Sequence, residues 1–268
     1  MSFKTKLAGL RAIRKFDNWV QVAVNRTFFP DTGCIVYRQG DIEVIVDHLG
    51  GDANGVRECL TSSMYRGLVA SIIEKDRNVR SILDIGANGG GFSLLTYLMK
   101  IPLSRVVCVE MNPRVFGRLA FNLYQNLHGV SIILIRGAIA ASAGSIDVSL
   151  GRGSTGDSLN GAHLAPGNGD RIELLSLDDI VNRAFSDNSI IDLCKIDVEG
   201  AEYEVFLGTE CTLVRRFRYL IMEIHELPGQ SREGLIMRLH ELGFDDISPK
   251  ARSEKTVFLF QNRTLRVS

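Results

Sequence analysis

The pattern of apolar and polar positions changes near residue 81. Beyond it, short and nearly continuous apolar runs alternate with longer segments whose apolar residues recur at helical spacing. The apolar runs predict strands at 81–86, 105–110, 130–137, 145–150, 190–197, 218–226 and 255–262, and the helically spaced segments predict helices at 91–99, 113–127, 176–185 and 232–242. Strands that are apolar on both faces are typical of a parallel sheet covered on both sides, so we predict a doubly wound α/β fold.

Residues 1–80 precede this alternation and predict a small α+β appendage. A helix begins it, followed by a strand pair at 33–47 that turns at Gln39-Gly40-Asp41, and then by a helix over 55–75. We therefore divide the chain into an appendage, residues 1–80, and a main domain, residues 81–268. In the main domain, Ser176 and Asp179 form a capping-box pattern at the start of the helix 176–185.

The first helix is basic, because Lys4, Lys6, Arg11, Arg14 and Lys15 all precede the first acidic residue of the chain. Its apolar residues recur at helical spacing, which is typical of an amphipathic helix. Two interpretations stay open. The helix packs on the body of the protein or on a second subunit of a homodimer, or it lies on a membrane surface near a lipid-linked substrate.

Composition narrows the class of protein. The formal net charge is zero, which argues against general nucleic-acid binding. The sequence has no run of about 18 apolar residues that predicts a membrane span, and no apolar segment that predicts a secretory signal follows the N-terminal charges. Its five cysteines form no CxxC pair. We therefore expect reduced, mostly buried thiols and a cytoplasmic location.

The segment "SILDIGANGGGF" (81–92) joins a predicted strand to a predicted helix through a glycine-rich turn. Such a turn lets a ligand approach the backbone closely. Asn88 stands where a dinucleotide motif would have its second glycine, and Asp84 lies two residues before Gly86. An acidic residue there disfavours pyrophosphate and favours a ligand with cationic groups, such as S-adenosylmethionine. Glu110 ends the next strand, where a carboxylate can accept hydrogen bonds from a ribose diol, although NAD sites share that feature.

The motifs "LDIGANGGGFSL", "CVEMNP", "SLDDIV", "KIDVEGAEYEVFLG" and "LIMEIHE" occur in this order. As a set, they resemble the FkbM family of S-adenosylmethionine-dependent O-methyltransferases, over about residues 80–262. The resemblance implies a seven-stranded methyltransferase sheet whose last strand is antiparallel. It also implies methylation of a hydroxyl on a sugar, glycoconjugate or natural product.

The resemblance implies roles for individual residues as well. Asp84, Gly86, Asn88 and Gly90 would surround the methionine moiety of the cofactor, and Glu110 would bind its ribose. Gly137 and Ala138 would lie by the adenine. The sequence departs from the family in two places. Met111 stands where the family commonly has proline, and residues 1–80 match no pattern of the family, which leaves the acceptor site undefined.

Four polar residues lie at the carboxyl ends of two predicted strands, 190–197 and 218–226, and they are our candidates for catalysis: Asp197, Glu199, Glu223 and His225. Ligands bind at the carboxyl ends of strands in open α/β sheets. Two mechanisms fit. In the favoured one, His225 or Asp197 removes the proton of the acceptor hydroxyl without a metal. In the other, Asp197 with Glu199 or Glu223 holds Mg²⁺, which lowers the pKa of that hydroxyl.

The segment 151–170 is rich in glycine and too long for a simple connection, so it is either a cover for the active site or an insertion without a role in it. Two other functions compete with the O-methyltransferase. One is a binding module that kept the fold and lost catalysis, and the other is an NAD(P)-linked oxidoreductase. The replacement of glycine by Asn88 counts against the oxidoreductase.

Overall fold

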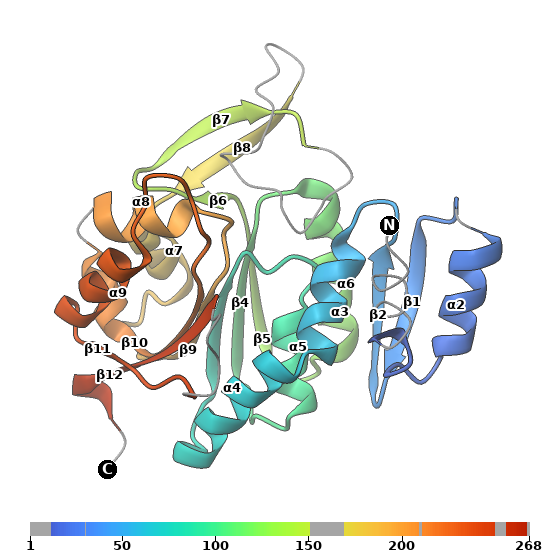
Figure 1. Ribbon diagram of the computed structural model, residues 1–268, viewed down its shortest axis with the longest axis horizontal. Helices are drawn as coiled ribbons and strands as arrows, with labels where there is room; N and C mark the ends of the chain where they lie inside the picture. Colours follow the sequence, from blue (N-terminus) through green and yellow to red (C-terminus); the bar gives the residue numbers. More distant parts are fainter. Residues whose placement is uncertain (1–11, 30, 151–168, 209–210, 250–255, 267–268) are drawn as a thin grey trace.

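The computed structural model describes residues 12–29, 31–150, 169–208, 211–249 and 256–266. Its centre is a seven-stranded sheet (Figure 1). In spatial order the strands are β11 (Phe244–Asp246), β12 (Val257–Asn262), β10 (Phe217–Glu223), β9 (Ile191–Ile196), β3 (Ser81–Ile85), β4 (Arg105–Glu110) and β5 (Ser131–Arg136). β12 runs antiparallel to both of its neighbours, whereas β10, β9, β3, β4 and β5 pair in parallel. The predicted fold class, with its antiparallel last strand, is confirmed.

Alternate residues of the central strands face opposite sides of the sheet. In β3, Ile82 joins one hydrophobic cluster, while Leu83 and Ile85 join the other. The first cluster is covered by α3 (Asp52–Thr61), α4 (Ser63–Lys75), α5 (Gly91–Leu98) and α6 (Pro113–Asn126), and the second by α7 (Leu177–Ala184), α8 (Ala201–Gly208) and α9 (Arg232–Glu241). Because helices cover both faces, every residue of β3 and β9 is buried, and these strands appear in the sequence as continuous apolar runs.

Several elements differ from the prediction. The helix expected over 55–75 is two helices, because Ser62 is extended (φ −67°, ψ 133°) and its side chain caps α4 by accepting from the Met64 amide. The sequence pattern also missed α2 (Trp19–Phe28), β11, the 3₁₀ turns η1 (Thr212–Arg216) and η2 (Arg263–Leu265), and β8 (Asp170–Leu175). β8 joins β6 (Ala138–Ile139) and β7 (Gly144–Val148) in a separate three-stranded sheet. Residues 151–168 of the predicted cover lie outside the described residues.

The N-terminal strand pair is the predicted hairpin, β1 (Cys34–Gln39) and β2 (Ile42–Asp47), and it is held against α6 by two asparagines. Asn122 accepts from the amide of Ile45 (2.8 Å) and donates to its carbonyl (3.0 Å). Asn126 makes the same pair of bonds with Glu43, at 2.9 and 2.8 Å. The two side-chain amides lie one helical turn apart and replace a neighbouring strand for β2.

The appendage and the main sheet share a hydrophobic core. The first cluster contains Tyr37 of the hairpin and Leu68 of α4 together with Ile82 and Leu193 of the sheet. The boundary drawn at residue 80 therefore does not separate two cores.

The expected capping box of Ser176 and Asp179 is present. All five cysteines are free, four of them buried and Cys34 exposed. Within the described ranges, no helix combines the length and apolar composition that crossing a bilayer requires.

Candidate active site

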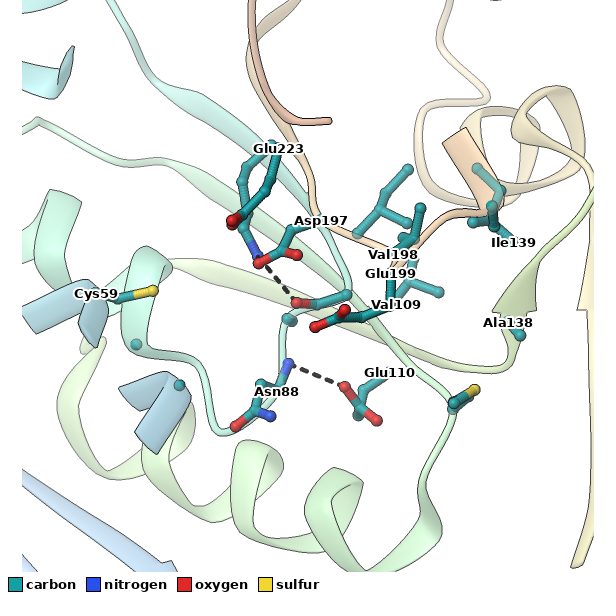
Figure 2. Close-up of a pocket in the computed structure, with 18 of the residues that line it drawn as sticks. Cys59, Asn88, Val109, Glu110, Ala138, Ile139, Asp197, Val198, Glu199 and Glu223 are labelled. Atoms are coloured by element: carbon teal, nitrogen blue, oxygen red, sulfur yellow. Dashed lines mark hydrogen bonds and ion pairs between the residues drawn. The ribbon is translucent and has the colours of Figure 1, made fainter. Parts of the chain in front are cut away.

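A pocket lies at the carboxyl ends of β3, β4, β9 and β10 (Figure 2). β3 and β9 are neighbours, but the chain continues from β3 toward β4 and from β9 toward β10, so the strand order reverses at the pocket. Of the predicted site residues, those that line it are Gly86, Asn88, Glu110, Ala138, Asp197, Glu199 and Glu223. Gly55, Glu58, Cys59 and Tyr65 add a wall from α3 and α4, which sequence reasoning did not identify.

The glycine turn after β3 is shaped by the loop after β9. Gly86 has φ +74°, and a Cβ atom on it would lie 1.8 Å from the carbonyl oxygen of Asp197, so only glycine fits. Asn88 is also left-handed (φ 49°), a conformation that asparagine tolerates better than most residues. Gly90 does not line the pocket. It caps α5 with φ +86° and packs toward Leu119 of α6, and its expected place by the methionine moiety stays a prediction.

Glu110 fixes this turn from the end of β4. Its Oε2 accepts from the amide of Asn88 (2.9 Å) and its Oε1 accepts from the amide of Asn112 (2.8 Å). The side chain is 8% exposed and lines the pocket, facing Asn88 (Figure 2). A carboxylate accepts several hydrogen bonds at once, so Glu110 is a suitable acceptor at this wall of the pocket.

Asp84 lies behind the pocket wall instead of in it. It is fully buried, and its Oδ2 accepts from the hydroxyl of Ser93 at 2.9 Å. Its Oδ1 has no hydrogen-bond partner and lies 3.7 Å from Nζ of Lys195. Burial raises the pKa of Asp84, and the Lys195 ammonium and the Ser93 hydroxyl offset part of that rise. In this structure Asp84 contacts a buried cation, and the cofactor contact expected for it stays a prediction.

Lys195, to which the sequence assigned no role, connects the two halves of the site. Its Nζ donates to the carbonyl of Gly86 (3.0 Å) and pairs with Oδ2 of Asp197 (3.1 Å). Burial alone lowers the pKa of Lys195, but the carboxylates of Asp197 and Asp84 outweigh burial and raise it above its ordinary value. The signal was available, because residues i and i+2 of a strand face the same side and this places Lys195 beside Asp197.

Glu223 has the most perturbed carboxyl group of the pocket. Its Oε2 accepts from the hydroxyl of Tyr65 at 3.1 Å, and Asp197 lies beside it (Figure 2). Burial and the charge of Asp197 raise the pKa of Glu223 to about 7, against the opposing effects of His225 and Tyr65. Burial also raises the pKa of Glu199, which lies in the turn after β9 with φ 52°.

His225 is held between carboxylates on both sides of its ring. Nδ1 lies 3.2 Å from Oε1 of the fully buried Glu202, and Nε2 lies 3.3 Å from Oε2 of Glu199 and 3.9 Å from Oδ1 of Asp197. Burial lowers the pKa of His225, but the bond and charge of Glu202, with Glu199 and Asp197, raise it to about 9. The carboxylates around this imidazole therefore stabilise its cation.

Three of the four catalytic candidates form a compact group. Asp197, Glu223 and His225 each present one donor atom, and these atoms lie within 4.8 Å of one another, close enough for a metal ion to bind between them. The Mg²⁺ alternative predicted a metal site whose side-chain ligands are carboxylates alone. The structure adds a histidine, which comes from two residues beyond the end of β10.

Comparison with known proteins gives a family match. The family model described as a methyltransferase FkbM domain matches residues 84–245. A search of curated proteins finds no match.

Among solved structures, an FkbM methyltransferase from Methylobacillus flagellatus is 16% identical, with 69% of this chain and 44% of that chain covered and a TM-score of 0.42. A putative RNA methyltransferase from Pyrococcus horikoshii is 15% identical, with coverage of 78% and 82% and a TM-score of 0.40. The M. capricolum protein TrmK, in complex with S-adenosyl-homocysteine, is 10% identical, with coverage of 73% and 67% and a TM-score of 0.41.

Proposed function

The chain belongs to the FkbM methyltransferase family, and from this we propose that it is an S-adenosylmethionine-dependent O-methyltransferase acting on a hydroxyl of a sugar, glycoconjugate or natural product. The observation that carries the proposal is the pocket itself. At one end of the pocket the buried carboxylate of Glu110 lies beside the glycine turn. At the other end lies the carboxylate of Glu223, whose pKa is about 7.

The first end suits the nucleoside part of the cofactor. Glu110 is already fixed by two backbone amides, so a ribose diol would meet a carboxylate that is oriented before binding, without further loss of entropy. Gly137 and Ala138 line the pocket on the same side and leave room for a flat base. When bound, S-adenosylmethionine supplies an electrophilic methyl group on a sulfonium. The carboxylates of Asp197, Glu199 and Glu223, at the other end of the pocket, stabilise the positive charge of the sulfonium.

Glu223 is the base that the geometry favours. A general base works best when its pKa is close to the working pH, and the pKa of Glu223 is about 7. The bond from Tyr65 orients one oxygen of the carboxylate and leaves the other for the acceptor hydroxyl. In this mechanism the proton of the acceptor hydroxyl moves to Glu223 as the new carbon–oxygen bond forms.

His225 and Asp197, the bases favoured by the sequence, take supporting roles. The pKa of His225 is about 9, so near neutral pH its ring carries a proton and cannot accept another. Its cation holds Glu199 and Glu202 in place. Asp197 pairs with Lys195 at 3.1 Å, which fixes its orientation beside Glu223.

The acceptor end favours a hydroxyl compound over nucleic acid. Glu58, Asp197, Glu199 and Glu223 line it together, and four carboxyl groups disfavour the phosphates of a polynucleotide. Carboxylates accept hydrogen bonds from the several hydroxyls of a sugar. Tyr65, Glu58 and Cys59 belong to α3 and α4, so we assign acceptor contacts to the appendage as well.

Two measurements test the proposal. Titration calorimetry should show binding of S-adenosylhomocysteine and none of NADH, and the bound product should raise the melting temperature because it binds the native state alone. A panel of glycosides, nucleotide sugars and RNA, incubated with methyl-labelled cofactor, should give label on a hydroxyl. Binding without any transfer would indicate the inactive binding module, label on RNA alone would exclude the acceptor class, and a preference for NADH would indicate the oxidoreductase.

A further inference from the structure

Four polar side chains of the appendage meet where α2, the β1–β2 hairpin and α3 come together. Arg26 is in the last turn of α2, Tyr37 is in β1, His48 directly follows β2, and Arg57 is in α3. In Figure 1 the hairpin lies between α2 and α3, and each of these helices contacts the nearer strand. We call the four residues the appendage cluster. None of them lines the pocket described above, so the proposed function does not use them.

Tyr37 and His48 form the neutral base of the appendage cluster. The hydroxyl of Tyr37 lies 3.0 Å from Nε2 of His48, the two rings meet edge to face with centroids 5.5 Å apart, and Tyr37 is fully buried. Burial, together with the charges of Arg26 and Arg57, lowers the pKa of His48 to about 4, against the opposing charge of Asp47. The imidazole is therefore uncharged near neutral pH.

The two arginines of the cluster act on the same hydroxyl. Burial raises the pKa of Tyr37, and the charges and hydrogen bonds of the Arg57 and Arg26 guanidiniums offset part of that rise. Because the hydroxyl oxygen accepts from guanidinium N–H groups, its own hydrogen is directed to Nε2 of the neutral His48. Tyr37 and His48 thus hold two cations side by side.

Neither arginine has an anionic partner. Within the part of the chain that the structure describes, Arg26 and Arg57 make no ion pair, and Arg57 donates instead to the neutral side chain of Asn54 at 2.5 Å. Glu58 is affected by the charge of Arg57, but it lines the pocket. Two guanidiniums at one hydroxyl repel each other, and each has five N–H donors, more than these contacts use. An oxyanion between them would relieve the repulsion and accept from the remaining donors.

We propose that Arg26 and Arg57 bind a phosphate-class oxyanion, with Tyr37 and His48 as the base that holds the two guanidiniums in place. The planar fork of a guanidinium matches two oxygens of a phosphate, which makes arginine well suited to recognise that group. Arg26 is exposed and Arg57 is half-buried, so the site is open to solvent. Because the base is neutral, both positive charges act on the ligand.

Two sources of the oxyanion share this chemistry: the phosphate of a phosphorylated acceptor, and free inorganic phosphate or pyrophosphate. α3 connects the site to the pocket, since Arg57 lies between the pocket-lining residues Gly55 and Glu58 in the sequence of that helix. The first source rests on the proposed function. Binding of the oxyanion itself does not.

The test is titration calorimetry of the full chain with inorganic pyrophosphate, at low salt and in a buffer without phosphate. Binding should be saturable. Arg26→Met and Arg57→Met should each weaken it by roughly 10–100-fold, because each removes hydrogen bonds between charged groups. Arg66→Met is the matched control, since Arg66 is also half-buried on a helix of the appendage, α4, but donates to the carbonyl of Leu60 at 3.4 Å.

The outcomes separate the site from a general effect of charge or of folding. Circular dichroism and melting temperatures establish which variants are folded, and the exposed Arg26 provides a test even if Arg57→Met does not fold. Absence of saturable binding, full affinity in every folded variant at Arg26 and Arg57, or an equal loss in Arg66→Met would overturn the proposal.

The same titrations with glucose 1-phosphate and uridine diphosphate glucose distinguish the two sources. Affinity above that for pyrophosphate, lost in Arg26→Met and Arg57→Met, would assign the site to a phosphorylated acceptor. Affinity no greater than that for pyrophosphate would assign it to the free anion. A failure of the proposed function would be seen separately, as absent binding of S-adenosylhomocysteine while pyrophosphate still binds.

Discussion

Glu223 and Tyr65 form the pair on which the rate should depend most directly. Because the base must be ionised, kcat should rise with pH and reach half of its plateau near pH 7, the pKa of Glu223. Glu223→Gln should lower kcat by roughly 10²–10⁴-fold and leave cofactor affinity within a few fold. The bond from Tyr65 lowers the pKa of Glu223, so Tyr65→Phe should move the half-point to higher pH. A pH–rate profile that is unchanged in Tyr65→Phe, or a near wild-type kcat in Glu223→Gln, would contradict the assignment. If instead a metal ion is needed, exhaustive EDTA treatment should abolish turnover.

Lys195 should support both stability and cofactor binding. It is 3% exposed, and Lys195→Met would leave Asp84 and Asp197 without their shared cation. Breaking a buried ion pair in this way costs about 3–5 kcal/mol in the free energy of unfolding. Urea denaturation should show this loss. Lys100→Met, which breaks an exposed pair with Asp41, should cost less than about 1 kcal/mol and serves as the control. Equal losses for the two variants would mean that the buried cation is not needed.

At the scale of elements, Asn122 of α6 connects the hairpin to the glycine turn. Besides its two bonds to Ile45, its side chain donates to the carbonyl of Gly89 at 2.9 Å. Asn122→Leu would leave these buried backbone groups without partners, at about 1–3 kcal/mol each, and should therefore lower both stability and cofactor affinity. The same change at Asn182, exposed on α7, should alter neither. Denaturation and calorimetry with S-adenosylhomocysteine measure the two effects, and intact cofactor affinity in Asn122→Leu would separate the hairpin from the site.

For the whole molecule, we expect the appendage and the main domain to unfold together. The first hydrophobic cluster joins them, and α3 approaches α5 so closely that a Cβ atom on Gly91 would lie 2.8 Å from Cα of Val56. Scanning calorimetry should give one transition whose calorimetric and van't Hoff enthalpies agree. A separate, earlier transition that disappears when residues 1–80 are removed would show instead that the appendage is an independent domain.

The sequence by itself determined the elements whose signals are local. The apolar run of β3, the helical spacing of α6 and the cap at Ser176 each depend on residues close together in the sequence, and all three were predicted. The sharp turn at Gly86 was predicted for the same reason. The residues at the ends of β9 and β10 could also be identified, because the carboxyl ends of parallel strands converge.

The tertiary structure alone decided the chemistry of these residues. The pKa of His225 depends on Glu202, 23 positions away, and that of Glu223 depends on a tyrosine 158 positions away in the appendage. Lys195 reaches Gly86 across 109 positions, and a Cβ atom at that glycine is excluded by a carbonyl from the loop after β9. Electrostatic effects depend on distances in space and on burial, which no local pattern encodes. The sequence therefore indicated which groups are in the site, and only the fold decided which of them can hold a proton near neutral pH.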